Sequence, residues 1–408
     1  MVQEWQGHAN IATTCIYDRR KIKPEERSFR RGLAETRRHG TSMPGLSATP
    51  IVSGSFAEPW WRSVELLHTQ WDHRRRGLVR SGAVGTEQKM HRILLLLSLV
   101  VSSTLAGGSL PLGDGPPAWA YPVNPPDFTE SPDDGSRLHV PDSDSTFTLT
   151  QIRDLNFCPD WHPGDHPPMP EIVARGHRPA VLACGSCHRA DGSGGPENAR
   201  VAGLPAAYIA QQMADFKSGA RKTSVPGRNP ERMVEVANAI TTEEITAAAD
   251  YFSALKPRSA IRVAEAVNAP KTRVVDWHLA VASTPGKEPL GQRIIEVPEN
   301  LEQFERRDGR SRWVAYVPPG SVQRGQKLVI SGGGKTVPCG ICHGPDLKGL
   351  GPIPGIAGRS PSYLIRQLYD FRAGVRGGAG GALMKPVVEK LSMDDMISLA
   401  AYAASLNP

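Results

Sequence analysis

The sequence is poor in cysteine, in long apolar runs and, over most of its length, in net charge. Its 408 residues include 6 cysteines. The apolar run at residues 93–106 is too short for a comfortable transmembrane helix, so we expect no permanent membrane span. The formal charge of +7 comes mostly from the first 89 residues, because residues 121–408 hold 32 Lys and Arg against 31 Asp and Glu. The basic balance therefore gives no support for nucleic-acid binding.

Four of the six cysteines lie in two copies of the pentapeptide Cys-x-x-Cys-His. Two thiols three positions apart on one helical turn can add to the two vinyl groups of a haem, and the next imidazole reaches the iron as proximal ligand. A thioredoxin-like redox pair or half of a zinc site does not require a His directly after the second Cys. The motifs therefore predict two covalently bound haem c groups. The residues concerned are Cys184, Cys187 and His188, and Cys339, Cys342 and His343.

Two cysteines lie outside these motifs, Cys15 and Cys158. Cys158 stands alone in the part of the chain that we expect in the mature protein, so it has no partner for an internal disulfide. A buried thiol is the simpler expectation. His162 and His166 are close enough in sequence to suggest a metal pair, but each is followed by Pro. We therefore expect them to be loop residues.

The two motifs anchor an internal repeat. A shift of 155 residues places the first half on the second without gaps from the first Cys onward. Tyr208 then falls on Tyr363, and Arg221 on Arg376. After a slip of four residues the correspondence resumes at a shift of 151. A repeat of this length indicates a duplicated domain rather than a solenoid unit.

Each repeat has the sequence pattern of a helical domain. A short helix is expected before each motif, and a second follows it, with apolar residues at helical spacing. Thr241 and Ser392 are predicted N-caps, each with an acidic residue three positions later, and each opens a closing helix. The expected ranges are 170–178, 206–217 and 243–255 in the first repeat, and 321–328, 362–372 and 393–406 in the second.

The repeat also selects a sixth ligand for each iron. A Met thioether opposite His is a soft ligand that favours Fe(II). Only Met233 and Met384 occupy equivalent positions, each eight residues before the N-cap of its closing helix. Met213 instead falls on Leu368, on the apolar face of the second helix, and is expected in the core. We therefore predict Met233 and Met384 as axial ligands.

Residues 166–257 and 319–408 resemble the two halves of a dihaem class I cytochrome c. The resemblance covers nearly all of both ranges. It implies a mainly α fold of two tandem small helical cytochrome c domains joined by an irregular, partly β segment, residues 258–318. That segment departs from the brief linker of short family members, because it contains two strand-like stretches, 273–280 and 312–317. Carried over by position, the resemblance implies these haem-binding residues: Cys184, Cys187, His188 and Met233 in the first domain, and Cys339, Cys342, His343 and Met384 in the second.

Residues 90–120 carry the pattern of a secretory signal peptide. A basic start, Met90-His-Arg92, precedes the apolar run 93–106, and Ala118-Trp-Ala120 offers an A-x-A cleavage site. This pattern predicts export to the periplasm, where haem is attached to such motifs in bacteria. Residues 121–165 are rich in Pro, Asp and Ser, and we expect an extension that is loosely ordered until about Phe147.

A signal peptide is expected at the start of a protein, but residues 1–89 precede this one. The first 30 residues resemble the C-terminal tail of a tyrosine recombinase or phage integrase, in which a Gly-His pair precedes the nucleophilic Tyr. These correspond to His8 and Tyr17, but the rest of a catalytic domain is absent from this sequence. We interpret residues 1–89 as a recombinase-like remnant or the result of a mis-assigned start, absent from the mature protein, with Met90 as the working start.

Iron that is saturated by His and Met has no open position for a substrate, which favours electron transfer over bond-making chemistry. We therefore expect a periplasmic dihaem c-type cytochrome with no catalytic residues. It would carry single electrons from a dehydrogenase or quinol-oxidising complex to an oxidase. Two alternatives stay open. One is a cytochrome subunit bound permanently to a dehydrogenase, and the other is a dihaem peroxidase, which would need one iron with a vacant sixth position.

Overall fold

The structure is a computed structural model that describes residues 115–227 and 229–408, and these belong to one compact unit. The expected recombinase-like remnant and most of the expected signal peptide lie outside the described residues. Within the described residues, no helix is both long and apolar enough to cross a membrane.

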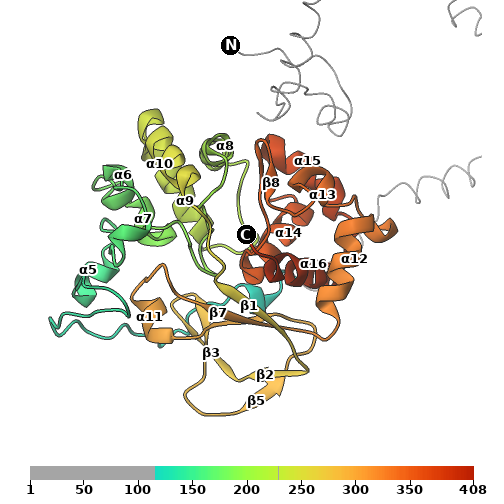
Figure 1. Ribbon diagram of the computed structural model, residues 1–408, viewed down its shortest axis with the longest axis horizontal. Helices are drawn as coiled ribbons and strands as arrows, with labels where there is room; N and C mark the ends of the chain where they lie inside the picture. The colour runs from blue at the N-terminus through green and yellow to red at the C-terminus, as the bar shows by residue number, and fades with distance from the viewer. Residues whose placement is uncertain (1–114, 228) are drawn as a thin grey trace, which may run out of the picture. The chain divides into compact units, whose positions relative to one another are not determined.

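The first repeat consists of helices around a small apolar core (Figure 1, green to yellow). Helix α8 packs against both α9 and α10, and α6 contacts α7 and α10. Phe252 on α10 is buried in this core, and Met213 on α8 packs against it. The elements are α6 (Glu171–Ala174), α7 (Cys184–His188), α8 (Ala206–Lys217), α9 (Asn229–Ala239) and α10 (Thr242–Ala254).

The second repeat has the same order of helices (Figure 1, orange to red). Its closing helix packs against the first helix so closely that a Cβ at Gly325 would collide with the carbonyl oxygen of Ser398. Met396 is fully buried there. The elements are α12 (Ser321–Ser331), a 3-10 turn (Gly332–Gly334), α13 (Gly340–His343), β8 (Gly349–Leu350), β9 (Ile353–Pro354), α14 (Pro361–Ala373), α15 (Gly378–Val388) and α16 (Met393–Ser405).

Both predicted N-caps are present as full capping boxes. The Thr241 hydroxyl accepts from the backbone N–H of Glu244, whose carboxylate accepts from the Thr241 N–H. Ser392 and Asp395 make the same reciprocal pair. The second and closing helices of both repeats begin and end within one residue of the predicted positions. These helices were predictable because local capping and apolar spacing agree.

The helix predicted over 170–178 is too long. Helix α6 ends at Ala174, and the chain turns at Gly176, whose φ of 60° places it in the left-handed region. In the second repeat the corresponding helix, α12, is three residues longer than predicted.

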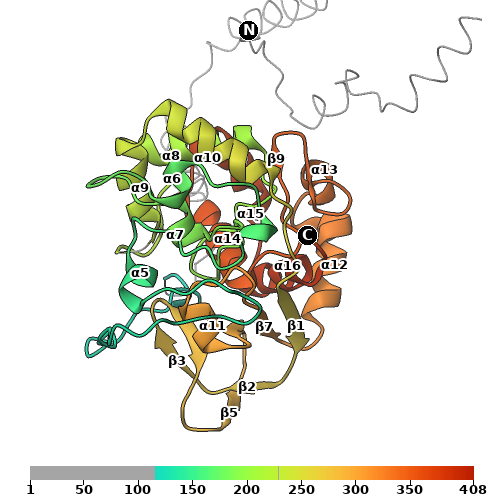
Figure 2. The ribbon, with the colours of Figure 1, turned by 60° about the vertical axis from the view of Figure 1, so that its left-hand side comes forward.

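Residues 258–318 form a small β unit beside the two repeats (Figures 1 and 2). A three-stranded sheet has the order β1-β7-β6, with β1 parallel and β6 antiparallel to β7. Two hairpin-like pairs, β2–β5 and β3–β4, extend from it. The elements are β1 (Ile261–Glu265), β2 (Asn268–Pro270), β3 (Thr272–Val275), β4 (His278–Val281), β5 (Lys287–Pro289), β6 (Ile295–Pro298), α11 (Leu301–Glu305) and β7 (Trp313–Val317).

The stretch 273–280 is a hairpin rather than one strand. Asp276 and Trp277 have φ angles of 42° and 68°, and they turn the chain between β3 and β4. The other predicted strand, 312–317, is present as β7. Two carboxylates of the β unit accept hydrogen bonds from the second repeat. Glu265 accepts from the N–H groups of Gly320 and Val322 at the start of α12, and buried Glu296 accepts from Ser360 and Ser362 at the start of α14.

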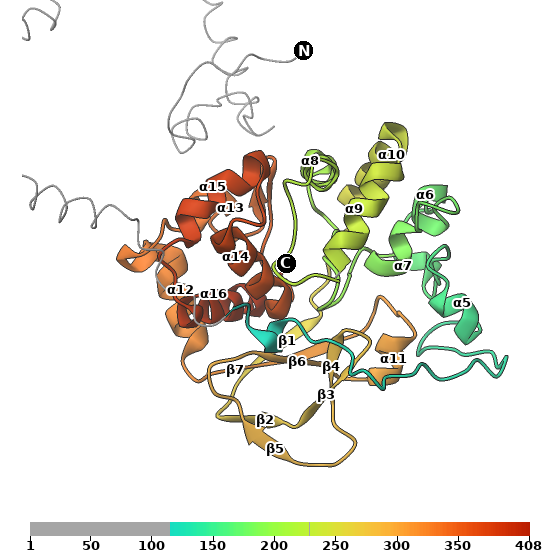
Figure 3. The same ribbon diagram turned by 180° about the vertical axis from the view of Figure 1, so that it is seen from behind.

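The extension before the first repeat is more ordered than the Pro- and Asp-rich composition suggested. Val140, Ile152 and Trp161 form a small buried cluster, and Leu138 pairs with Phe147 through their backbones. Its elements are α5 (Leu149–Arg153) and a 3-10 turn (Pro163–Asp165), and another 3-10 turn (Ala118–Ala120) precedes it at the end of the expected signal peptide. Ala120 and Tyr121, at the expected cleavage point, are buried against the second repeat. Figure 3 shows this extension (cyan) running along the β unit.

Candidate haem-binding sites

Both Cys-x-x-Cys-His motifs fold into one short turn of helix, which brings the two thiols and the imidazole of each motif to one place. The first motif is α7. In the second, Cys339 is the N-cap of α13 and has helical backbone angles. No disulfide joins the four motif cysteines in the described residues, and each has intermediate exposure. Burial raises the pKa of Cys184 to about 12 and that of Cys339 to about 11, so these free thiols are protonated at neutral pH.

The two motif histidines are held in the same way. His188 Nδ1 lies 2.7 Å from the carbonyl oxygen of Ala199, and His343 Nδ1 lies 2.8 Å from that of Pro354. Ala199 and Pro354 are equivalent under the shift of 155. A carbonyl can only accept, so Nδ1 carries the proton and Nε2 keeps its lone pair for a metal. Burial lowers the pKa of both imidazoles, which favours the neutral, ligating form.

The two methionines predicted as axial ligands both lie on helices that the sequence analysis did not predict. Met233 is on α9 and Met384 on α15, and both side chains are partly buried. Each stands eight residues before a confirmed N-cap. Met384 packs at the edge of the second repeat's core.

The repeats meet through a nearly symmetric network of polar side chains, most of them partly buried. Arg221 donates to Gln212, Gln367 and Tyr363, at 2.8, 3.2 and 3.3 Å. Arg376 donates to Gln367, Tyr208 and Gln212, at 2.7, 2.9 and 3.1 Å. The backbones of Arg221 and Arg376 also pair as an isolated antiparallel bridge. Residues that are equivalent in the sequence repeat therefore contact one another where the two repeats meet.

This network holds an excess of positive charge. Arg200 donates to the carbonyls of Ala357 and Gly358, and Arg359 donates to those of Arg200 and Gly355, so the acceptors are neutral. Burial and neighbouring Arg359 lower the pKa of Arg200 to about 9.

The same arginines lower the pKa of the nearby Tyr363. Burial by itself would raise the pKa of Tyr363, but Arg221, Arg376 and Arg359 lower it to about 8. Buried guanidiniums with neutral partners suit the carboxylates of a bound group.

These features fit haem c. Each motif offers two thiols for its vinyl groups and an imidazole with a free Nε2 for its iron. The buried guanidiniums between the repeats offer charge partners for its propionates. The sequence analysis did not single out these arginines, although the match of Arg221 with Arg376 in the repeat was a visible signal.

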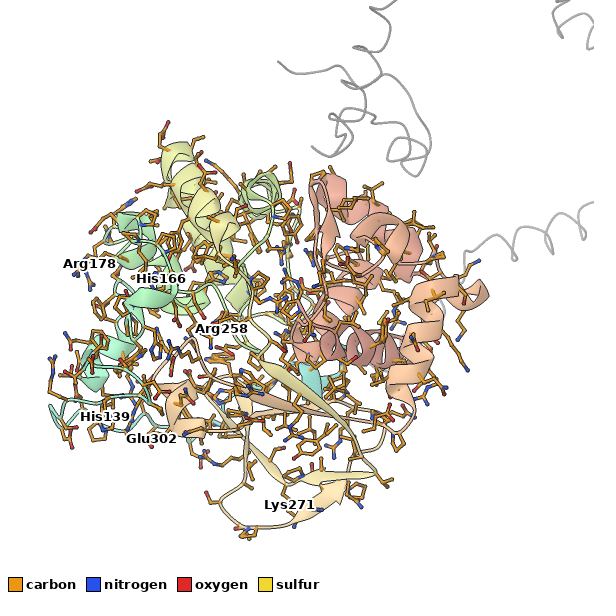
Figure 4. All side chains as sticks on the ribbon, in the orientation of Figure 1. His139, His166, Arg178, Arg258, Lys271 and Glu302 are labelled. Atoms are coloured by element: carbon orange, nitrogen blue, oxygen red, sulfur yellow. The ribbon has the colours of Figure 1, made fainter. Side chains whose placement is uncertain are left out.

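The other residues that the sequence singled out have separate surroundings. Cys158 is buried as expected, and burial raises its pKa to about 12. His162 Nε2 lies 3.1 Å from Asp308, whereas His166 Nε2 lies 3.2 Å from Asp160. Figure 4 shows His166 in the first repeat, near Arg258. Each histidine therefore has its own carboxylate partner.

Comparison with known proteins gives one family. A family model described as "Cytochrome c" matches residues 173–256. The chain is 28% identical to the thiosulfate dehydrogenase electron acceptor of Stutzerimonas stutzeri, over 57% of this chain and 82% of that protein. It is 31% identical to cytochrome c4 of Stutzerimonas stutzeri, over 32% of this chain and 69% of that protein.

Among solved structures, thiosulfate dehydrogenase (TsdBA) from Marichromatium purpuratum matches with a TM-score of 0.38 and 29% identity, over 55% of this chain and 37% of that one. These matches give no support to the recombinase-like resemblance of residues 1–30. The two Cys-x-x-Cys-His helices and the match to cytochrome c4 both point to the same family. The chain belongs to the cytochrome c family, and it is a haem-binding electron carrier.

Proposed function

We propose that the protein is a dihaem cytochrome of the periplasm that carries single electrons from a dehydrogenase or quinol-oxidising complex to an oxidase. The observation that supports this best is the pair of motif histidines, His188 and His343. Both donate from Nδ1 to repeat-equivalent carbonyls and so keep Nε2 for iron. A chain with two such sites suits the transfer of electrons one at a time.

Each side chain would have a definite role. Cys184 and Cys187, and likewise Cys339 and Cys342, would tether one haem c each. His188 and His343 would be proximal ligands with a fixed tautomer, and the Ala199 and Pro354 carbonyls would hold their rings. Met233 and Met384 would complete the coordination. Haem, when bound, supplies the one-electron Fe(III)/Fe(II) couple, and the protein excludes water and balances the charge around it.

The name of the Stutzerimonas relative, an electron acceptor for thiosulfate dehydrogenase, supports a dehydrogenase as the donor. A carrier must release its partner between electrons, so we expect contacts below about 1,200 Å² in total. The almost balanced charge of residues 121–408 should make long-range steering weak. Permanent attachment to a dehydrogenase is the second candidate, and a dihaem peroxidase is the third.

Export would follow from the signal at residues 90–120, with translation from Met90 and a mature N-terminus near Tyr121. Residues 1–89 would then be absent from the mature protein. The domains would be the extension 121–165, cytochrome c domains at 166–257 and 319–408, and the β unit 258–318 between them.

Stopped-flow spectroscopy on the protein expressed from Met90 tests this function. With the Stutzerimonas thiosulfate dehydrogenase and thiosulfate as donor, both haems should be reduced, and an oxidase should reoxidise them. Hydrogen peroxide turnover of the half-reduced protein should stay at background. Robust peroxide turnover would move the protein to the peroxidases, and a dehydrogenase that copurifies and cannot be separated would make it a subunit.

A further inference from the structure

The two haem motifs differ at the residue that follows the histidine. In the first motif this residue is Arg189, and in the second it is Gly344. The backbone has nearly the same conformation at both, with φ 70° and ψ 159° at Arg189 and φ 83° and ψ 155° at Gly344. This region is almost restricted to glycine, so Arg189 occupies it under strain. The strain indicates that the side chain at this position has a use.

The Arg189 side chain is buried rather than extended into water, and only 4% of the residue is exposed. Its guanidinium lies 3.6 Å from the Glu197 carboxylate, measured between Nη2 and Oε1. It also stacks on Phe304 of α11, with its central carbon 5.4 Å from the ring centre. Phe304 is itself buried and comes from the β unit, so this unit covers the first motif.

A second arginine of the β unit contacts the same motif. Arg307 donates from Nη1 to the carbonyl oxygen of Ser186, which lies between the two motif cysteines, at 3.0 Å. Ser186 is fully buried, whereas Ile341, its counterpart in the second motif, is 46% exposed. Arg189 therefore has no counterpart in the second motif, where the guanidiniums that act on the histidine are those of Arg359 and Arg376.

These charges bear on electron transfer. An iron site has one more positive charge when oxidised than when reduced. A fixed cation in a poorly screened interior therefore disfavours the oxidised state and raises the reduction potential. The Glu197 carboxylate, paired with Arg189, balances part of this charge. Loss of Arg189 removes one positive charge from the site in either state of the pair, and it should thus lower the potential.

We propose that Arg189, supported by Arg307 and Phe304 of the β unit, is a positioning residue of the first haem site that raises the reduction potential of that haem alone. The proposal rests on the dihaem function proposed above. It gives the β unit a role, because Phe304 and Arg307 of that unit support a charge at the first of the two sites. The second motif, with glycine at the same position, is the internal reference.

The test is a spectroelectrochemical titration of the full dihaem protein. The Met384→His background should lower the potential of the second haem and so separate the two waves. In that background, Arg189→Gly should lower the potential of the first haem and leave the second unchanged. Glycine suits the backbone at this position, so the variant should fold and load haem. Arg189→Lys keeps the charge and should retain most of the native potential, whereas Arg189→Gln should behave like Arg189→Gly.

Arg175→Gln is the matched control, since it removes an exposed arginine from the same repeat. It should move neither potential. The proposal is wrong if Arg189→Gly and Arg189→Gln leave the first potential at its native value, or if Arg189→Lys lowers it as much as Arg189→Gln does. A failure of Met384→His to separate the waves would instead count against the proposed axial ligand and the dihaem function.

Discussion

At the residue scale, the sequence predicts haem-binding side chains, but it does not predict the groups that surround them. The spacing within Cys-x-x-Cys-His is set by haem chemistry, so it is visible in any chain. The carbonyls of Ala199 and Pro354 that hold the histidines lie eleven residues downstream, Ala199 in a loop and Pro354 in the two-residue strand β9, and no side chain marks them. The arginines between the repeats were equally hard to recognise from the sequence, because their acceptors are mostly backbone atoms and neutral side chains.

The axial methionines give the first prediction. Met233→His and Met384→His should each lower the potential of one haem and abolish the near-infrared charge-transfer band of Fe(III)–thioether at that site, because imidazole stabilises Fe(III) better than thioether does. Met213 packs in the core of the first repeat, so Met213→Leu should cost less than about 1.5 kcal/mol and leave both haems unchanged. Altered ligation in Met213→Leu would show that the wrong methionine was chosen in the first repeat.

His278 should make stability depend on pH. It is 1% exposed, and burial lowers its pKa from 6.5 to about 4. The folded protein therefore holds it neutral, whereas the unfolded chain binds a proton below pH 6.5. The stability is present above that pH and is lost as pH falls towards 4. In urea unfolding, the native protein should lose about 2 kcal/mol more than His278→Leu between pH 7.5 and 5. The exposed His139→Gln should behave like the native protein, and equal losses in native protein and His278→Leu would contradict this assignment.

At the scale of elements, the helices that have regular apolar spacing or capping residues in the sequence were predicted, and the helices that lack these patterns were not. Helix α8 was predicted over its observed range, since its apolar spacing is clear. Helices α9 and α15 were missed because they contain Pro230 and Pro386, and α15 begins in a run of glycines. Asp276 and Trp277 lack the Asn-Gly or Asp-Gly signature of a tight turn, so the hairpin β3–β4 was taken for one strand.

The capping boxes predict that removing either N-cap hydroxyl lowers the unfolding free energy by a similar amount. Thr241→Ala and Ser392→Ala should each cost about 1 kcal/mol of unfolding free energy, because each leaves a backbone N–H of the first turn without its acceptor. Ser405→Ala near the end of α16 removes a hydroxyl of the same kind from an exposed site, and it should cost much less. Urea unfolding measures all three, and a loss in Ser405→Ala equal to that in Ser392→Ala would contradict the role of the cap.

At the scale of the molecule, the duplication predicted two similar domains but not how they meet. Arg221 and Arg376 share Gln212 and Gln367 as acceptors, so the two repeats are bonded through one common network. A sequence repeat shows which residues are equivalent, but it does not show that the equivalent residues touch. The β unit adds a further connection, since Glu265 and Glu296 bond it to the second repeat while Arg307 bonds it to the first.

The shared network predicts coupling between the two arginines. Arg221→Gln and Arg376→Gln should each cost about 1–3 kcal/mol, because each removes three partly buried hydrogen bonds. The double variant should cost more than the sum, since in each single variant the remaining arginine still donates to both glutamines. Thermal unfolding by calorimetry measures these losses, with Arg175→Gln as the exposed control. Strict additivity, or single losses no larger than that of the control, would show that the network does not join the repeats.

The central claim is that one exported chain holds two covalent haems. Pyridine haemochrome analysis, combined with the intact mass of the periplasmic protein expressed from Met90, tests it most directly. The expected result is two haems per chain that resist extraction into acid acetone, on a polypeptide that begins near Tyr121. A single haem per chain, or haem that extracts into acid acetone, would contradict the account.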